Sequence, residues 1–439
     1  MKSPPCAALA VDTPGIPGVS TANAAARCSA RPAHDGPGFA TLDPVTERSA
    51  PSPGSHASDL EPNGDEPFAL GTAGLDIDRF DPDYRAWLDG AIRTLRAEGT
   101  RSADTHLRSV PLLCAAGIDI YLKDESTHPT GSLKHRLARS LFLHALTNGW
   151  IKPGKPIIEA SSGSTAVSEA YFARLIGNPF IAVIARSTAA EKIRLIRAQR
   201  GQCHFVDDPN EVYQVSARLA TETGGHFMDQ FTHAERATDW RGNNNIAESI
   251  YRQMACERFP EPTWIVTTAG TGGTSATIAR YVRYSGRAAG ICVADPENSA
   301  FILGWAQNDP SVTTSLPSRI EGIGRQRVEP SFVGTAVDRM IRVPDAASIA
   351  TMHVVEELLG VRVGASTGTG LWACFRIAHE MIAAGHTGSI VTLLCDGGER
   401  YADKYYNPDW LVEQGLDPEP HRSRLQAFLD APGEAAARR

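Results

Sequence analysis

The sequence predicts an α/β protein with a mostly parallel sheet. Short runs rich in β-branched residues alternate with helical patterns of roughly 10–20 residues, which is the order of βαβ units. Several of these runs are followed directly by small polar residues and glycines, as at the ends of parallel strands. The 439 residues also exceed the length at which one compact core usually stops growing, so we expect two subdomains.

Regular structure is expected to begin near Asp81 and Pro82, because Asp is a good helix N-cap and Pro suits the first helical position. Apolar residues then recur at three- and four-residue spacing from Tyr84 to Leu95, which predicts an amphipathic helix. The strands expected after it are Pro156–Glu159, Phe180–Ile184, Cys203–Val206, Trp264–Thr268, Ile291–Ala294 and Ile390–Leu394.

The two ends of the chain differ from the rest. Residues 1–72 are rich in Pro, Ser, Ala, Gly and acidic residues and carry few large apolar side chains, so we expect a disordered tail. A targeting or partner-binding segment is the alternative, although the excess of acidic over basic residues disfavours a transit peptide. Residues 421–439 are rich in Ala and Arg and are expected to form a C-terminal tail with a frayed helix.

Composition narrows the classes of partner. A net charge of −7 argues against nucleic acid, and no apolar run approaches the roughly 18 residues of a membrane span. The early apolar run from Cys6 to Val11 is shorter than a signal-peptide core, so a cytoplasmic location is expected. The eight cysteines form no CxxC pair, which predicts thiols rather than a metal site.

Lys134 is one of only seven lysines. It follows the turn residues Pro129, Thr130 and Gly131 and is expected in the first turn of a helix whose leucines form one face. The dipole at the start of a helix lowers the pKa of a lysine, which favours a neutral amine that can act as a nucleophile or form a Schiff base. Taken alone, a lysine is more typically a solvated surface residue.

Two loops follow expected strands. We call residues 161–165, Ser-Ser-Gly-Ser-Thr, the serine loop. Small residues at a strand-to-helix turn expose N–H groups that bind a carboxylate or a phosphate, although Ser-Gly turns are also common connectors. We call residues 270–274, Gly-Thr-Gly-Gly-Thr, the glycine loop. It lacks the glycine at Ser275 that a dinucleotide fingerprint needs and has no GK[ST], so it suits a single phosphate group, or else a tight turn.

A reactive lysine, a carboxylate-binding loop and a loop for one phosphate are the set that pyridoxal 5′-phosphate and an amino-acid substrate require. The chain indeed resembles the fold-type II pyridoxal 5′-phosphate enzymes of the cysteine synthase and cystathionine β-synthase superfamily, and within it most the actinobacterial L-cysteine desulfhydrases. The resemblance runs from about residue 76 to about 418. The matching segments are PTGSLKHR (129–136), SSGSTA (161–166), DQFTHAERATDWRGNNNIAESI (229–250), AGTGGTSATIARY (269–281), DPENSAF (295–301), RIEGIGR (319–325), VGASTGT (363–369) and GGERYADKYY (397–406).

The resemblance implies a tryptophan synthase β-like fold, with the cofactor between two α/β subdomains. The catalytic unit would span 73–420, with a smaller mobile subdomain at about 126–234 and a larger one formed by 73–125 and 235–420. The resemblance also implies a homodimer.

The resemblance assigns roles to individual residues. Lys134 would form the Schiff base with the cofactor and then move the Cα proton. The cofactor phosphate would lie against Gly270, Thr271, Gly272, Gly273 and Thr274. The substrate carboxylate would lie against Ser161, Ser162, Gly163, Ser164, Thr165 and Gln230, with Gly322, Ile323 and Gly324 near the substrate side chain.

Two positions depart from most relatives. Ser164 replaces an Asn that bonds the cofactor 3′-oxygen, although the desulfhydrases share the Ser. Gly397 stands where relatives place a hydroxyl against the pyridine nitrogen, so either a water takes this place or Asp396 turns inward and protonates the nitrogen.

The function that the resemblance implies is β-elimination from L-cysteine, giving sulfide, ammonia and pyruvate. The alternatives are β-replacement, as in cysteine synthase or a β-substituted alanine synthase, then a serine or threonine dehydratase, and last an inactive cofactor-binding regulatory protein.

Overall fold

The computed structural model describes residues 81–102, 104–241 and 245–432. All of them belong to one compact unit, 73–439. The predicted N-terminal tail, 1–72, therefore lies outside the described residues, as does the end of the C-terminal tail from residue 433.

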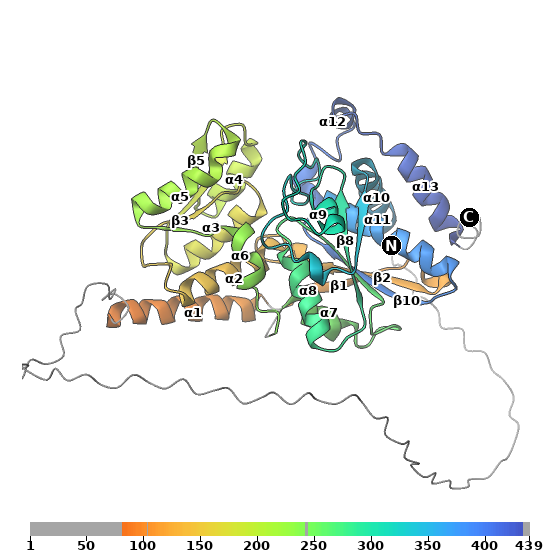
Figure 1. Cartoon of the computed structure of the whole chain (residues 1–439), viewed down its shortest axis with the longest axis horizontal. Helices are drawn as coiled ribbons and strands as arrows, with labels where there is room; N and C mark the ends of the chain where they lie inside the picture. Colours follow the sequence, from red (N-terminus) through yellow and green to blue (C-terminus); the bar gives the residue numbers. More distant parts are fainter. Residues whose placement is uncertain (1–80, 103, 242–244, 433–439) are drawn as a thin grey trace, which may run out of the picture. The chain divides into compact units, whose positions relative to one another are not determined.

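Two sheets organise the described residues, and the predicted α/β class with mostly parallel strands is confirmed. The first has the order β5-β4-β3-β6 and is parallel throughout. The second has the order β1-β2-β10-β7-β8-β9, in which only β1 runs antiparallel to its neighbour. Figure 1 shows the first sheet grouped with α2–α6 and the second with α7–α11. We call these groups the small lobe and the large lobe.

The strands are β1 His106–Val110, β2 Ile118–Asp124, β3 Ile157–Glu159, β4 Phe180–Ala185, β5 Gln202–Val206, β6 His226–Phe227, β7 Trp264–Thr268, β8 Gly290–Pro296, β9 Arg339–Val343 and β10 Gly388–Leu394. The helices are α1 Pro82–Arg101, α2 Lys134–Thr147, α3 Ser164–Ile176, α4 Ala190–Ala198, α5 Val212–Thr223, α6 Gln230–Ala237, α7 Ile246–Met254, α8 Gly273–Tyr284, α9 Phe301–Gln307, α10 Asp345–Leu359, α11 Ala365–Ala383, α12 Pro408–Glu413 and α13 Glu419–Asp430.

The predicted start of regular structure is confirmed. Helix α1 has Asp81 as its N-cap, the Asp81 side chain accepts a hydrogen bond from the Asp83 N–H, and Pro82 is the first helical residue. Ala91 and Leu95 of α1 share a hydrophobic core with α2 and α3. Helix α1 thus packs on the small lobe, although the predicted boundaries assigned its residues to the larger subdomain; those boundaries stay a prediction.

All six predicted strands are present, with ends shifted by at most two residues. Strands β1, β2, β6 and β9 were not predicted. In β2, the charged residues Asp119, Lys123 and Asp124 interrupt the apolar pattern. All seven of its residues are nevertheless buried, since Lys123 donates to the Thr105 carbonyl and the two aspartates pair with arginines that reach in from the surface.

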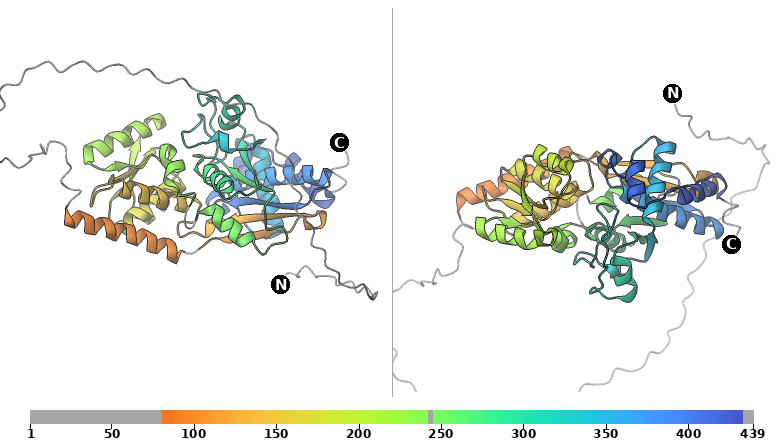
Figure 2. Two further views of the ribbon diagram at one scale, coloured as in Figure 1. Left: turned by 60° about the horizontal axis from the view of Figure 1, so that its bottom comes forward. Right: turned by 90° about the horizontal axis from the view of Figure 1, so that it is seen from above.

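The C-terminal helix packs on the large lobe. Where a frayed helix was expected, α13 runs from Glu419 to Asp430 and buries Leu425 and Phe428 in the core that also contains Val354 and Val355 of α10. Figure 2 shows α13 alongside α10 and α11 from two further directions.

Candidate active site

The predicted site segments meet at the carboxyl ends of β3, β7 and β10. The Leu133 N–H donates a 2.8 Å hydrogen bond to the Cys395 carbonyl, and Ser132 pairs with Asp396, so the turn before α2 is joined to the end of β10. The Gly324 N–H donates to the Ala269 carbonyl at 2.8 Å, which joins the loop at 322–324 to the glycine loop. In α/β proteins, ligands bind at this edge of a parallel sheet.

Lys134 is the first residue of α2 and thus lies in the first helical turn, as predicted, where it is only partly accessible. Its Nζ makes no hydrogen bond or ion pair with any described residue. Burial lowers the pKa of Lys134, while the neighbouring Cys395, Glu159 and Glu169 act in the opposite direction. The pKa of Lys134 is therefore shifted in the predicted direction, with burial as the main cause. The Lys134 amine thus has no partner among the described residues, and burial favours its neutral form.

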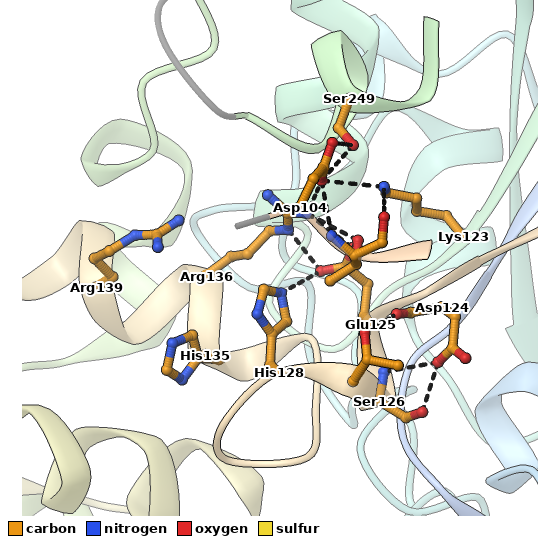
Figure 3. A network of polar contacts seen from close by, with 12 residues as sticks. Asp104, Lys123, Asp124, Glu125, Ser126, His128, His135, Arg136, Arg139 and Ser249 are labelled. Atoms are coloured by element: carbon orange, nitrogen blue, oxygen red, sulfur yellow. Dashed lines mark hydrogen bonds and ion pairs between the residues drawn. The ribbon is translucent and has the colours of Figure 1, made fainter. Parts of the chain in front are cut away.

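A buried ionic network fixes the beginning of α2, two residues after Lys134 (Figure 3). Arg136 forms two hydrogen bonds with Glu125, at 2.6 and 3.1 Å, and Glu125 also contacts Nε2 of His128 at 2.9 Å. Burial alone would raise the pKa of Glu125, but the Arg136 charge and these hydrogen bonds hold it well below its usual range. The network therefore holds α2 against the segment that follows β2.

Lys123 belongs to the same network and is fully buried. Its ammonium donates to the Thr105 carbonyl at 2.8 Å and to Oε1 of Gln253 at 2.7 Å, and it lies 3.2 Å from Asp104 (Figure 3). Burial lowers the pKa of Lys123 to about 8. This lysine is thus tied into the structure and differs from the free amine of Lys134.

The serine loop lies at the start of α3. Gly163 is the N-cap, Ser164 is the first helical residue, and a Cβ atom added to Gly163 would meet nothing within 4 Å, so the loop borders open space. The Thr165 hydroxyl donates a 2.8 Å hydrogen bond to Oε1 of Gln230. The structure therefore brings Gln230, at the start of α6, to the serine loop. Ser161 accepts a 3.3 Å hydrogen bond from the Gly163 N–H, and Ser162 is partly exposed nearby.

The glycine loop connects β7 to α8, and close packing requires its glycines. A Cβ atom at Gly270 would lie 2.3 Å from the Gly322 carbonyl oxygen, and one at Gly272 would lie 2.5 Å from the Phe332 Cα. At Gly273 it would lie 2.9 Å from Cβ of Ala234. Thr271 is buried and precedes Gly272, the N-cap of the 12-residue helix α8. Thr274 is partly buried and lies in the first turn of α8, where N–H groups lack helical partners.

Gly322 and Ile323 lie beside the glycine loop, as the contact of Gly270 with the Gly322 carbonyl demonstrates. Ile323 is buried, whereas a Cβ atom at Gly322 would meet nothing within 4 Å. The backbone of Gly322 has a φ of +86°, which glycine adopts without strain. This loop therefore also borders open space.

Asp396 is buried, and its Oδ2 accepts a 2.7 Å hydrogen bond from the Tyr401 hydroxyl. Its Oδ1 has no hydrogen-bond partner among the described residues and is the atom that a Cβ at Gly364 would strike, at 2.1 Å. Burial raises the pKa of Asp396 to about 6. The carboxyl group is thus turned toward Tyr401 and Gly364, and its contact with a pyridine nitrogen stays a prediction.

Three groups near the site were not singled out from the sequence. Ser366, in the first turn of α11, lies beside the Cys395 thiol and places a hydroxyl near the end of β10. Arg400 donates a 2.8 Å hydrogen bond to the Ser164 hydroxyl, and Glu169 is a fully buried acid whose charge acts on Lys134. Ser366 and Arg400 lie in segments that carry the family resemblance, whereas Glu169 had no sequence signal beyond an acid within an apolar helix.

The residues present fit pyridoxal 5′-phosphate. The cofactor aldehyde needs a free amine, which Lys134 has, and its phosphate needs N–H donors at a helix start, which α8 offers behind the glycine loop. The unpartnered Oδ1 of Asp396 adds a buried polar atom near the end of β10. Within 81–102, 104–241 and 245–432, no cluster of His, Cys, Asp and Glu side chains suits a metal ion, and no helix is long and apolar enough to cross a membrane.

Comparisons with known proteins agree with this site. Residues 102–396 match the family described as pyridoxal-phosphate dependent enzyme. L-cysteine desulfhydrase Cds1 of Mycobacterium tuberculosis is 59% identical over 348 residues, which cover 78% of this chain and 95% of that protein. Cysteine synthase 1 of Neurospora crassa is 28% identical over 313 residues, 68% of this chain and 80% of that protein.

A solved structure, that of O-ureido-L-serine synthase, has the same fold, with a TM-score of 0.60 and 24% identity, covering 70% of this chain and 96% of that one. Fold and site therefore define a cofactor-dependent α/β enzyme. The chain belongs to the pyridoxal-phosphate dependent enzyme family, and the predicted family and cofactor are confirmed.

Proposed function

We propose that this protein is an L-cysteine desulfhydrase, which converts L-cysteine and water to sulfide, ammonia and pyruvate. The observation that carries the proposal is the 59% identity to L-cysteine desulfhydrase Cds1, against 28% to Cysteine synthase 1 of Neurospora crassa. The free amine of Lys134 at the carboxyl edge of the sheet supports it, because the reaction needs an amine that can hold the cofactor aldehyde and accept a proton.

Pyridoxal 5′-phosphate, when bound, supplies the electron sink that makes the Cα proton of an amino acid acidic and lets a β-substituent leave. We assign its phosphate to Gly270, Thr271, Gly272, Gly273 and Thr274, and its aldehyde to Lys134. Ser164 and Asp396 are proposed as further contacts of the cofactor.

Lys134 is the proposed base. A base must be unprotonated when it accepts a proton, and burial favours the neutral amine at this position. Its Nζ accepts the Cα proton of cysteine and is then the acid that can return a proton to the departing thiolate. The serine loop and Gln230 are proposed to hold the substrate carboxylate, and Gly322 and Ile323 to border the thiol-bearing side chain.

The decisive experiment measures sulfide and pyruvate together, with L-cysteine as the only substrate. We expect equal amounts of both without an added nucleophile. Ser164→Ala should slow the reaction, because the loop orients the carboxylate of the reacting molecule. Turnover that appears only when O-acetylserine and sulfide are supplied would contradict the proposal and support cysteine synthase. Activity confined to serine or threonine would support the dehydratase.

Three finer properties belong to the same proposal. L-Cysteine is the proposed physiological substrate, the protein is proposed to be a homodimer, and its location is proposed to be cytoplasmic. Sedimentation equilibrium of the purified protein would test the dimer, and cell fractionation would test the location.

A further inference from the structure

Arg400 reaches from the segment after β10 into the region between the serine loop and the turn before α2. One Nη atom donates a 2.8 Å hydrogen bond to the Ser164 hydroxyl, and the other donates at 2.8 Å to the Thr130 carbonyl. A Cβ atom added to Gly131 would lie 2.7 Å from the guanidinium, so the arginine packs closely against this turn. Arg400 thus contacts the segments on either side of the proposed carboxylate site.

The charge of this guanidinium has no close counter-ion. Within the part of the chain that the structure describes, no carboxylate lies within ion-pair distance of Arg400. The Arg400 charge lowers the pKa of Asp396, but the Asp396 carboxyl group makes its hydrogen bond with Tyr401 and none with Arg400. Most other arginines near the site are paired, as Arg136 is with Glu125 and Arg325 with Glu329.

The Arg400 guanidinium also has N–H donors that its present hydrogen bonds do not use. An arginine carries five N–H donors, of which the contacts with Ser164 and Thr130 use two. Both of these acceptors are neutral, so neither compensates the positive charge. A partly buried cation with spare donors, beside a loop of small residues with exposed N–H groups, is suited to a carboxylate.

We propose that Arg400 binds the α-carboxylate of the amino-acid substrate, together with the serine loop. The inference rests on the proposed function for the location of the carboxylate, but not for the reaction that follows. It assigns Arg400 a role in substrate selection: compounds that carry a carboxylate beside the amine bind, whereas the corresponding simple amines bind weakly.

The test uses the holoenzyme and two ligands that cannot undergo elimination. L-Alanine has both amine and carboxylate, and ethylamine is the same molecule without the carboxylate. Dissociation constants are measured from the change in cofactor absorbance and by calorimetry. The variants are Arg400→Gln, which removes the charge, Arg400→Lys, which keeps it, and Arg218→Gln on the exposed side of α5 as the control.

A charge-assisted hydrogen bond contributes enough that its loss should weaken L-alanine binding about ten- to a hundredfold in Arg400→Gln. Ethylamine binding should change by less than about threefold, Arg400→Lys should fall between, and Arg218→Gln should match the wild type. If Arg400→Gln weakens both ligands equally, Arg400 only supports Ser164 and Thr130, and the inference is wrong. It is equally wrong if L-alanine binding does not change.

Failure of the inference and failure of the proposed function are distinguishable. If the wild type releases no sulfide from cysteine but its preference for L-alanine depends on Arg400, the proposed reaction is wrong and the inference stands. If sulfide and pyruvate are released from cysteine while the preference for L-alanine is independent of Arg400, the proposed reaction stands and the inference is wrong.

Discussion

Glu159 and Glu169 are two fully buried carboxyl groups whose charges act on each other and on Lys134. The Gln230 N–H donates to Oε2 of Glu159 at 3.3 Å, whereas neither carboxyl oxygen of Glu169 has a hydrogen-bond partner among the described residues. Burial, with the charge of the other carboxyl group, raises the pKa of Glu169 well above its usual value. Burial raises the pKa of Glu159 to about 8, and Asp229 adds to this effect.

This pair predicts a particular dependence of stability on pH. Between the ordinary carboxyl pKa and about 8, the unfolded chain releases protons that the native protein keeps. The native state therefore loses stability as pH rises through this range, by at most about 1.4 kcal/mol per pH unit for each proton. Glu169→Gln removes much of this loss, so we expect its stability relative to the wild type to increase from about pH 5 to about pH 8.

Urea unfolding at several pH values measures this difference. Lys134 has a lowered pKa and contributes in the opposite direction, so the comparison is repeated with Lys134→Ala in both proteins. Glu413→Gln, on the exposed side of α12, is the control. Parallel pH profiles for Glu169→Gln and the wild type would show that the pair does not hold an extra proton.

Lys134 should be the lysine that carries the cofactor. In Lys134→Ala the yellow colour of the protein-bound cofactor should disappear, and borohydride should no longer fix the cofactor covalently, because the variant lacks the amine. Lys155→Ala, at an exposed position, should behave as the wild type. Peptide mapping after reduction locates the adduct, and an adduct on Lys123 would refute the assignment.

The ionic network that holds α2 should matter more for stability than an exposed ion pair. Glu125→Gln removes the fully buried carboxylate that Arg136 contacts at 2.6 Å, while Asp104 remains 3.2 Å away, and should cost about 1.5–3 kcal/mol of unfolding free energy. Asp207→Asn removes an ion pair with Arg186 in which both side chains are more than half exposed, and should cost less than about 1 kcal/mol. Chemical denaturation measures both values, and equal costs would contradict the prediction.

Removing residues 1–70 should leave turnover and melting temperature nearly unchanged, because their sequence carries no core pattern. Removing residues 419–439 is the contrasting truncation. It exposes core positions that Leu425 and Phe428 cover, each worth about 1.5–3 kcal/mol, and should lower the melting temperature clearly. Loss of stability on removal of the N-terminal segment would show that it packs on the catalytic unit.

Much of the framework was predictable because its determinants are local. Asp81 and Pro82 specify the start of α1 by capping chemistry, and β7 is recognisable as an apolar run before a glycine-rich turn. Local sequence patterns also predicted Lys134 in the first turn of α2 and the serine and glycine loops directly after strands. Strand β2 was not predicted, because the hydrophobic periodicity of the sequence cannot show that Lys123 and Asp124 are buried and paired.

The sequence by itself therefore determined the fold class, the family and the chemistry that Lys134 can supply, since these depend on residue types at short spacing. Only the tertiary structure decided which distant groups surround that lysine. Arg400 meets Ser164 across 236 positions of the chain, and Glu159 meets Glu169 through the packing of β3 and α3. Charge, burial and pKa at a site arise from such contacts, which no local pattern encodes.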